Sequence, residues 1–243
     1  TATIHKDGYS WDIGPLLLEG FALHEKIGKV ITELSLTDKI TKKREDRGQW
    51  FPDFEFWRPK EYEGPYWRRE LLKKKFPSES IALDRYYKFH DRMMTLLAIA
   101  NQLEWTKGLK SIWLKLKLFP KFLKLKKWMD WNAAQVMDFF FKEPKIKAIY
   151  LAILADFVIK PSEFYGLGVP AVNIETAFDK RIPLEIKGGK LPTYHYIKGG
   201  CEQLVKAFAD FITANGGKIY TNSLIQKIIV EKGQATGVKL ENG

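Results

Sequence analysis

The sequence predicts an α+β fold in which a mixed sheet adjoins a largely helical region. Strand-like runs and glycine turns lie near both ends of the chain, at residues 1–15 and 218–240. From residue 61 to residue 118, apolar residues recur at intervals of three and four, the period of a helix packed on one face. Hydrophobic residues make up 45% of the 243 residues, which is enough to bury a core and argues against global disorder.

The N-terminal elements are predicted from local patterns. Residues 1–15 predict two short strands around a turn at residues 6–8. Residues 16–28 predict a helix that ends at its final glycine. The alternating run 30–46 and the aromatic run 47–59 predict strands, the second of them broken by prolines.

The central region predicts helices. A long helical pattern opens at Ser78 and Glu79, which are placed as a capping pair. Residues 133–141 and 145–159 predict two more helices. The helical period is lost over residues 161–192, where glycine and proline recur and indicate irregular structure.

The C-terminal region predicts a helix followed by strands. Residues 202–214 place apolar side chains on one helical face, and two glycine pairs bracket them. Gly199-Gly200 would let a neighbour approach the backbone at the positive end of this helix, and residues 216–217 would end it. Residues 218–240 predict a strand, a kink and a second strand, with a hairpin turn near residues 232–233.

Residues 166–171, with the sequence GLGVPA, match the dinucleotide-binding pattern GxGxxA in form. The true fingerprint follows a buried strand and opens a helix that receives the pyrophosphate. Neither context is predicted here, so we interpret the segment as a turn and assign no cofactor from it.

The segment 105–131 is basic, aromatic and amphipathic. It holds eight lysines against one acidic residue, and four of its apolar residues share a helical face: Leu109, Ile112, Trp113 and Leu116. Pro120 is predicted to open a second helix. This composition is typical of helices that lie in a membrane surface. The residues expected to contact an anionic membrane are Trp105, Lys110, Trp113, Lys115, Lys117, Lys124, Lys126 and Trp128.

Two other interpretations of this segment remain open: a solvated lysine face over an ordinary core helix, and a nucleic-acid surface. The net charge of +11 favours anionic partners of any kind. Nucleic acid is not the expected partner, because arginine is scarce in the segment and no recognisable nucleic-acid module surrounds it.

The sequence predicts no metal site and assigns no catalytic residue. Cys201 is the single cysteine, the four histidines are scattered, and no catalytic dyad or triad stands out. The longest uncharged apolar stretches are shorter than the roughly 20 residues of a membrane span. We therefore expect a cytoplasmic, peripheral membrane location.

Three stretches of the chain carry family motifs. Residues 7–18, DGYSWDIGPLLL, match the pattern DGxxxDxGP, and residues 73–80, KKKFPSES, contain a segment similar to FPxE. Residues 199–243 resemble the returning half of a flavin-binding domain. In this order, the three resemble the phytoene desaturase family of FAD-dependent oxidoreductases, which includes carotenoid isomerases and retinol saturases.

The resemblance implies contacts to FAD. Gly14 and Pro15 would pass close to the flavin ring, and Gly199 and Gly200 would lie near it from the other side. Ile225 takes the position, usually valine, whose backbone contacts the adenine. The motif aspartate, Asp12, is expected to be structural.

The family's GxGxxG unit, its ribose-binding acid and its C-terminal segment do not occur in this sequence. We therefore expect an α/β-type flavoprotein fragment that binds FAD weakly or not at all. Residues 1–20 and 197–243 would belong to the FAD-binding domain. Residues 21–196 would form the substrate-binding domain, in which 105–131 provides basic, membrane-facing helices.

The resulting hypothesis is an FAD-dependent oxidoreductase or isomerase that acts on a long apolar polyene or isoprenoid lipid at a membrane surface. In such an enzyme the flavin carries the redox chemistry and the protein supplies shape and electrostatics. The alternative hypothesis is a non-catalytic lipid-surface or anion-binding module, which requires only the basic segment.

Overall fold

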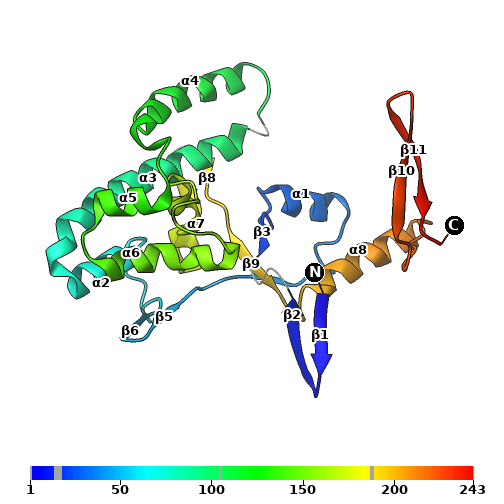
Figure 1. Cartoon of the computed structure of the whole chain (residues 1–243), viewed down its shortest axis with the longest axis horizontal. Coiled ribbons are helices and arrows are strands. Elements are labelled where there is room, and N and C mark those ends of the chain that lie inside the picture. Colours follow the sequence, from blue (N-terminus) through cyan, green and yellow to red (C-terminus); the bar gives the residue numbers. More distant parts are fainter. Residues whose placement is uncertain (1, 14–17, 104–105, 187–188, 243) are drawn as a thin grey trace.

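The computed structural model describes residues 2–13, 18–103, 106–186 and 189–242. Its helices and small sheets confirm the predicted α+β class. Most helices gather on one side of the molecule, whereas the strands nearest the termini and the helix α8 lie on the other (Figure 1). All strand pairs among the described residues are antiparallel, where a mixed sheet was expected, because hairpins and returning strands connect them in place of helical crossovers.

The elements follow one another along the chain with short connections. The α-helices are α1 Lys26–Glu33, α2 Trp67–Lys75, α3 Ser80–Leu103, α4 Leu109–Leu123, α5 Ala133–Phe140, α6 Pro144–Leu151, α7 Gly168–Val172 and α8 Glu202–Ala214. The strands are β1 Ala2–Lys6, β2 Tyr9–Ile13, β3 Leu18–Glu19, β4 Lys42–Arg44, β5 Gln49–Phe51, β6 Phe54–Phe56, β7 Glu185–Ile186, β8 Gly189–Lys190, β9 Tyr194–Ile197, β10 Ile225–Glu231 and β11 Gln234–Leu240.

Two hairpins close on two-residue turns, as predicted. Asp7 and Gly8 have φ of 52° and 79° between β1 and β2, and Lys232 and Gly233 have φ of 50° and 80° between β10 and β11. Two successive positive φ values belong to the turn type that matches the twist of a hairpin. The strand predicted before the kink near residue 222 is absent from the described residues, where the chain is irregular from 218 to 224.

The helix predicted at 16–28 is wrong, because that stretch contains β3 and only the start of α1. Gly20 has φ of 91°, a left-handed conformation that breaks the chain between strand and helix. The central strand β9 pairs with β3 on one side and with β4 on the other. The run predicted as a strand at 30–46 therefore divides into the end of α1, a turn and the short strand β4.

The main hydrophobic core lies among the helices and is centred on α3. It contains buried residues from β6 to Leu191, and rings such as Tyr86, Phe89 and Phe140 contact one another within it. The predicted helix at 133–141 is confirmed as α5, which begins with a reciprocal capping box between Asn132 and Gln135.

Some predicted helix boundaries are wrong. Glu79 does not cap α3, because its carboxylate accepts the backbone N–H groups of Lys142 and Glu143 at 2.7 and 2.6 Å and so tethers the chain before α6. Pro120 lies inside α4 and opens no second helix. The carbonyl that this proline leaves without an intrahelical donor belongs to Leu116, on the exposed face where water can satisfy it.

Gly166 and Gly168, in the GLGVPA segment, allow close packing. A Cβ atom at Gly166 would lie 2.5 Å from Val136 Cγ2, and one at Gly168 would lie 2.8 Å from the Phe164 ring. The segment was predicted as a turn, but its second half forms the one-turn helix α7.

A second, smaller core joins residues from both ends of the chain. Phe21, Ile31, Leu36 and Ile40 pack there with Ile197 and Ala207. The α1 region is thus packed against β9 and α8.

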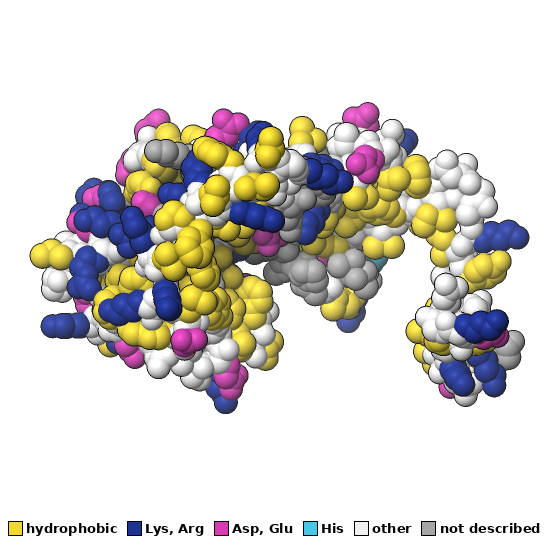
Figure 2. All heavy atoms as spheres, turned by 90° about the horizontal axis from the view of Figure 1, so that it is seen from above, with side chains coloured by type: hydrophobic (Ala, Val, Ile, Leu, Met, Phe, Trp, Pro, Cys, Tyr) yellow, Lys and Arg dark blue, Asp and Glu magenta, His cyan; other side chains and the backbone are white. Residues whose placement is uncertain are grey.

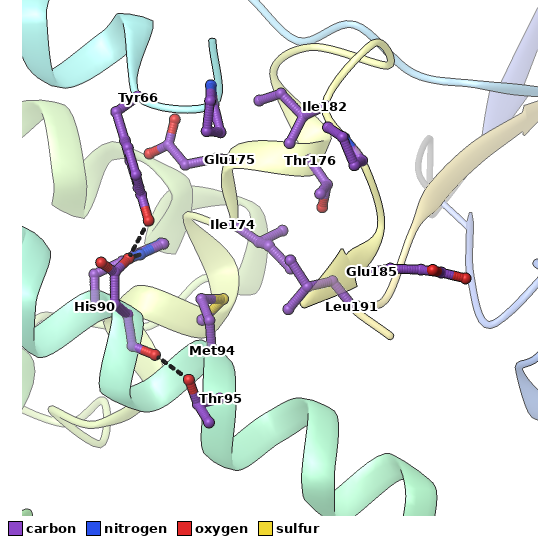
Figure 3. A pocket seen from close by; sticks show the side chains of 13 residues that line it. Tyr66, His90, Met94, Thr95, Ile174, Glu175, Thr176, Ile182, Glu185 and Leu191 are labelled. Atoms are coloured by element: carbon purple, nitrogen blue, oxygen red, sulfur yellow. Dashed lines mark hydrogen bonds and ion pairs between the residues drawn. The ribbon is translucent and has the colours of Figure 1, made fainter. Parts of the chain in front are cut away.

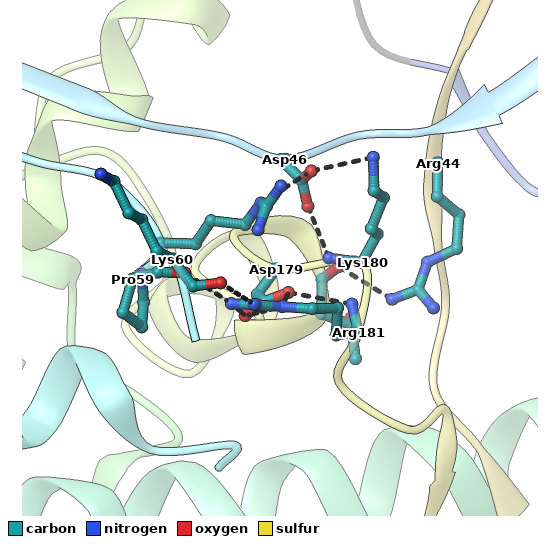
Figure 4. Close-up of polar contacts among 9 residues, drawn as sticks. Arg44, Asp46, Pro59, Lys60, Asp179, Lys180 and Arg181 are labelled. Atoms are coloured by element: carbon teal, nitrogen blue, oxygen red, sulfur yellow. Dashed lines mark hydrogen bonds and ion pairs between the residues drawn. The ribbon is translucent and has the colours of Figure 1, made fainter. Parts of the chain in front are cut away.

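A polar network joins three loops that border the main core (Figure 4). The Arg181 guanidinium forms a two-pronged ion pair with the fully buried Asp179 and also donates to the carbonyl groups of Pro59 and Lys60, each at 2.8 Å. Asp46 contacts Arg58 at 3.0 Å and accepts the backbone N–H of Lys180 at 2.7 Å. These bonds fix the loops that border the core.

Candidate functional site

The β1–β2 hairpin is bonded to the N-terminus of α8 through Asp12. The Asp12 carboxylate accepts the hydroxyl of Thr3 at 2.7 Å and the backbone N–H of Cys201 at 3.0 Å. The hydrogen bond from Thr3 lowers the pKa of Asp12, and the bond from Cys201 lowers it further. His5 Nε2 lies 2.9 Å from a carboxylate oxygen of Glu202, at the first residue of α8.

The glycines predicted to approach a flavin approach their own chain in this structure. Gly199 and Gly200 have φ of 85° and 90°, which a side chain would strain. A Cβ atom at Gly200 would lie 2.8 Å from Asp12 Oδ1, and one at Gly199 would lie 3.1 Å from Gln203 Cγ. The space over Gly200 is therefore filled by the β1–β2 hairpin.

The other predicted flavin residues are Gly14, Pro15 and Ile225. Gly14 and Pro15 lie outside the described residues. Ile225 is the first residue of β10 and is 52% exposed. The strand β10 lies beyond the C-terminal end of α8, whereas Gly199 and Gly200 directly precede the N-terminal end of this helix, which is about 20 Å long (Figure 1).

The N-terminus of α8 is not open to a phosphate group of FAD. A helix N-terminus binds a pyrophosphate through free backbone N–H groups and its positive dipole end. At α8 the N–H of Cys201 is already bonded to the Asp12 carboxylate, whose negative charge would repel a phosphate. We therefore derive no chemical step through a flavin from these residues.

The helix α4 carries apolar side chains on two opposite faces. Leu114 is buried and Leu118 is half-buried on the inner face, where Leu118 packs on the main core. The outer face exposes large apolar side chains at the spacing of one helical stripe. They are Leu109, Ile112, Trp113, Leu116, Phe119 and Leu123.

Lysines border the outer face of α4. Lys110 and Lys124 are exposed on one side of the stripe. Lys117 lies on the same side but is half-buried, with its Nζ 4.9 Å from the centre of the Trp113 ring. Lys115 is exposed on the other side, and Lys126 is exposed just beyond the helix. Figure 2 looks onto this part of the molecule and shows a hydrophobic patch with Lys and Arg side chains around it.

Two of the three tryptophans predicted to contact a membrane lie in the described residues, and they differ in their surroundings. Trp113 is 59% exposed, whereas Trp128 is half-buried, with its ring centre 5.2 Å from that of Phe89 in the main core. Trp105 lies outside the described residues. No helix in the described ranges is both long enough and apolar enough to cross a bilayer.

A buried ionic network lies at the centre of the helical region, and sequence analysis did not predict it. Arg68 Nη1 lies 3.1 Å from Glu175 Oε1, which also accepts the hydroxyl of Tyr87 at 2.9 Å. Arg68 also donates to the carbonyl of Asn173 at 3.3 Å. Arg68 and Glu175 are 107 residues apart, so no local pattern relates them.

Metal binding has no support in the side chains that the structure places. Within the described ranges, no three His, Cys, Asp or Glu side chains lie close enough together to hold an ion.

Comparison with known proteins gives three significant similarities, and no family model matches the chain. Over 179 residues, 71% of this chain, it is 28% identical to a chloroplastic prolycopene isomerase of Daucus carota. Over 49 residues, 20% of this chain, it is 45% identical to a 4,4'-diapophytoene desaturase of a Methylomonas species. A neurosporene-forming phytoene desaturase of Cereibacter sphaeroides is 43% identical, also over 49 residues.

These matches cover 26%, 10% and 10% of the lengths of the three relatives, respectively. The chain therefore spans about a quarter or less of each. The relatives are enzymes of carotenoid desaturation and isomerisation, and the chain is similar to them at low identity or over short stretches.

Proposed function

We propose that this chain is part of an FAD-dependent oxidoreductase or isomerase that acts on a long apolar polyene or another isoprenoid lipid. The observation that carries the proposal is the similarity of 179 residues to a prolycopene isomerase, supported by two shorter similarities to desaturases. In the corresponding domain division, the helical region would bind the substrate. Residues 1–20 and 197–243 would adjoin the cofactor.

The cofactor part of this proposal rests on the family resemblance. The Asp12 carboxylate occupies the N-terminus of α8, where a phosphate would otherwise meet free backbone N–H groups. We therefore expect the isolated chain of 243 residues to bind FAD weakly or not at all.

Absorbance near 450 nm in the purified chain tests the cofactor proposal. A stoichiometric flavin signal from the 243 residues alone would contradict weak binding. If the longer protein that contains this chain carried no flavin, the oxidoreductase proposal itself would fail.

We also propose that α4 docks the protein on an anionic, cytoplasmic membrane surface. Its outer face combines exposed leucine, isoleucine, phenylalanine and tryptophan side chains with flanking lysines. Each lysine near such a surface contributes on the order of 1 kcal/mol, and the apolar stripe adds burial in the headgroup region. The polyene substrates of the proposed enzyme would dissolve in the same membrane.

Vesicle sedimentation tests this docking. We expect binding to vesicles that contain anionic lipid, and a large loss when Lys115, Lys117, Lys124 and Lys126 are all changed to glutamate. Unchanged binding of this variant would remove α4 from the membrane contact. A matched control changes lysines away from α4, such as Lys227 and Lys239 on the C-terminal hairpin.

The second candidate function is a non-catalytic lipid-surface or anion-binding module. The exposed basic and apolar face of α4 would suffice for it. Vesicle binding by a full-length protein that carries no flavin would favour this candidate. A gel shift with nucleic acid that weakens with salt would instead favour a nucleic-acid partner.

A further inference from the structure

A serine, a histidine and a glutamate meet where the β1–β2 hairpin contacts the start of α8. His5 Nδ1 lies 2.8 Å from Ser10 Oγ, and His5 Nε2 lies 2.9 Å from Glu202 Oε2. Ser10 is the residue opposite His5 in the hairpin, whereas Glu202 lies 197 positions after His5, at the first residue of α8. All three residues are exposed, so a molecule in solution can reach them.

The carboxylate of Glu202 determines how the protons are arranged in this group. A carboxylate accepts hydrogen bonds and donates none, so the proton of a neutral His5 ring is assigned to Nε2. His5 Nδ1 then carries the lone pair, and the hydroxyl of Ser10 donates to it. The result is the order of a catalytic triad: a hydroxyl nucleophile, an imidazole base and a carboxylate that orients the imidazole.

Hydrogen bonds outside this group hold its members in place. The Asp12 carboxylate accepts the hydroxyl of Thr3 at 2.7 Å and the backbone N–H of Cys201 at 3.0 Å, which joins both strands of the hairpin to the start of α8. Thr3 Oγ1 also accepts the backbone N–H of Glu202 at 3.4 Å. The position of Glu202 relative to His5 therefore does not depend on their own contact alone. Such independent support is what keeps a catalytic group in its productive geometry.

The backbone at Ser10 provides a donor for a developing oxyanion. In a hairpin closed by a two-residue turn, the pair next to the turn exchanges backbone hydrogen bonds and the following pair does not. Lys6 and Tyr9 are the pair next to the turn, so His5 and Ser10 are the following pair. The N–H of Ser10 therefore points to the outer edge of β2, beside its own hydroxyl. The N–H of the nucleophile itself is one of the oxyanion donors in serine hydrolases.

We propose that Ser10 is a nucleophile that hydrolyses small activated carboxylic esters. Ser10 Oγ attacks the carbonyl carbon of the ester while His5 Nδ1 takes the hydroxyl proton, and Glu202 stabilises the imidazolium that forms. The bond between the acyl carbon and the alcohol oxygen then breaks, the alcohol leaves with the proton from His5, and an acyl-serine remains. A water molecule that gives its proton to His5 attacks the acyl-serine, which releases the carboxylic acid and restores the Ser10 hydroxyl.

The exposure of the group sets the class of ester. Water surrounds much of His5 and Glu202, whose side chains are 59% and 52% exposed, and it weakens every charge interaction with the transition state. One oxyanion donor in water stabilises this state less than an enclosed site would. The alcohol must therefore be a good leaving group, such as p-nitrophenolate, and the acyl group small. This activity requires neither flavin nor a membrane, so it is independent of the proposed function.

Two reagents test the proposal on the purified chain. Hydrolysis of p-nitrophenyl acetate measures the activity, and we expect Ser10→Ala to lower its rate about tenfold or more. A fluorophosphonate identifies the nucleophile, because an activated serine oxygen displaces its fluoride and forms a stable bond to phosphorus. Peptide mass spectrometry should find this adduct on Ser10 in preference to other serines, such as Ser35 and Ser223.

Further variants separate the base from the positioning residue. His5→Gln should reduce the labelling of Ser10 and lower hydrolysis about as much as Ser10→Ala does, and the double variant should be no less active than either, since the residues act as a unit. Glu202→Gln keeps an oxygen that accepts from His5 Nε2 but removes the charge, so it should lower kcat and leave KM unchanged. His24→Gln is the matched control, because His24 contacts the carbonyl of Leu191 outside this group. Circular dichroism checks that each variant is folded.

Unchanged hydrolysis by Ser10→Ala would overturn the proposal even if His5→Gln were inactive, because an imidazole acting alone would then cleave the ester. An adduct spread evenly over several serines would overturn Ser10 as the nucleophile. Hydrolysis no faster than that by an equal concentration of free imidazole would also overturn the activity. Because no measurement uses flavin or vesicles, these outcomes and those of the cofactor and docking tests are distinguishable.

Discussion

Arg68 and Glu175 form an ion pair inside the helical core, with Arg68 Nη1 3.1 Å from Glu175 Oε1 and the arginine fully buried. The Arg68 guanidinium also lies over the ring of Phe178, with its carbon 3.4 Å from the ring centre. This pair links α2 to the 3₁₀ turn Glu175–Ala177. It also holds Glu175 at the wall of a cavity of about 290 Å³ between α3 and the chain that follows α7 (Figure 3).

Replacing Arg68 by methionine should therefore destabilise the fold strongly. The change leaves the buried Glu175 carboxylate without its cation, which costs about 3–5 kcal/mol. Arg69→Met is the matched control, because Arg69 pairs with Glu70 on the surface and such pairs contribute about 0–1 kcal/mol. Urea unfolding of both variants measures the difference. Equal losses would show that the buried pair has no special role.

This pair also marks a limit of prediction from sequence. The apolar spacing of Tyr86, Phe89 and Met93 was enough to predict the helix α3, because local periodicity reports which face is buried. A buried arginine has no local signal, since its partner lies in a segment without regular pattern. The same reason explains the error at residues 16–28, where β3 exists only because it pairs with the distant strand β9.

The candidate sites also differ in how far the sequence alone could predict them. The outer face of α4 could be predicted because its lysines and apolar residues are close in sequence. The group of Ser10, His5 and Glu202 could not, because Glu202 lies 197 positions after His5. The sequence did not predict the contact between Gly200 and Asp12. The glycine pair did indicate that another group approaches the backbone closely there.

Substitution of Gly200 by alanine should cost more stability than the same change at Gly216. Both residues have positive φ, 90° and 79°, so both substitutions carry backbone strain of about 1 kcal/mol. Only at Gly200 would the new Cβ meet other atoms, at 2.8 Å from Asp12 Oδ1, whereas nothing lies within 4 Å at Gly216. Thermal unfolding of the two variants separates the contributions. A Gly200→Ala protein as stable as Gly216→Ala would mean that the β1–β2 hairpin does not press on α8.

His195 should make the fold sensitive to mild acid. Burial and, to a smaller extent, the charges of Lys42 and Arg44 together lower the pKa of His195 to about 4. Between this value and the unfolded value of about 6.5, the unfolded chain binds more protons than the folded one. Stability is therefore lost as the pH falls from about 6.5 towards 4, at up to roughly 1.4 kcal/mol per pH unit.

His195→Gln removes this titration, so urea unfolding at pH 7, 6 and 5 isolates it. The carboxyl groups titrate in both the variant and the unsubstituted protein, so their effect on the free energy of unfolding cancels in the comparison. The unsubstituted protein should lose stability relative to the variant as the pH falls. A constant difference between the two from pH 7 to pH 5 would contradict the low pKa.

The surroundings of Trp113 and Trp128 give them different roles, although the sequence pattern had placed both at a membrane. Trp113 lies on the outer face of α4, and Trp128 packs against Phe89 and Phe140. Trp113→Phe should change the free energy of unfolding by less than about 0.5 kcal/mol, as for an ordinary surface position. Trp128→Phe should lower it more, because it leaves space in the core.

Tryptophan emission in the presence of anionic vesicles tests the same pair. An indole that enters the headgroup region leaves water, and its emission shifts to shorter wavelength. We expect this shift in the unsubstituted protein and in Trp128→Phe, and its loss in Trp113→Phe, since Trp113 is the one of these two that lies on the docking face. If Trp113→Phe kept the shift and Trp128→Phe lost it, the membrane would have to contact the core side of α4. That side is already covered by α3, because Leu114 and Leu118 face inward there. The docking proposal and the fold could not then both be correct, so this pair of spectra tests the orientation of α4 as well as its binding.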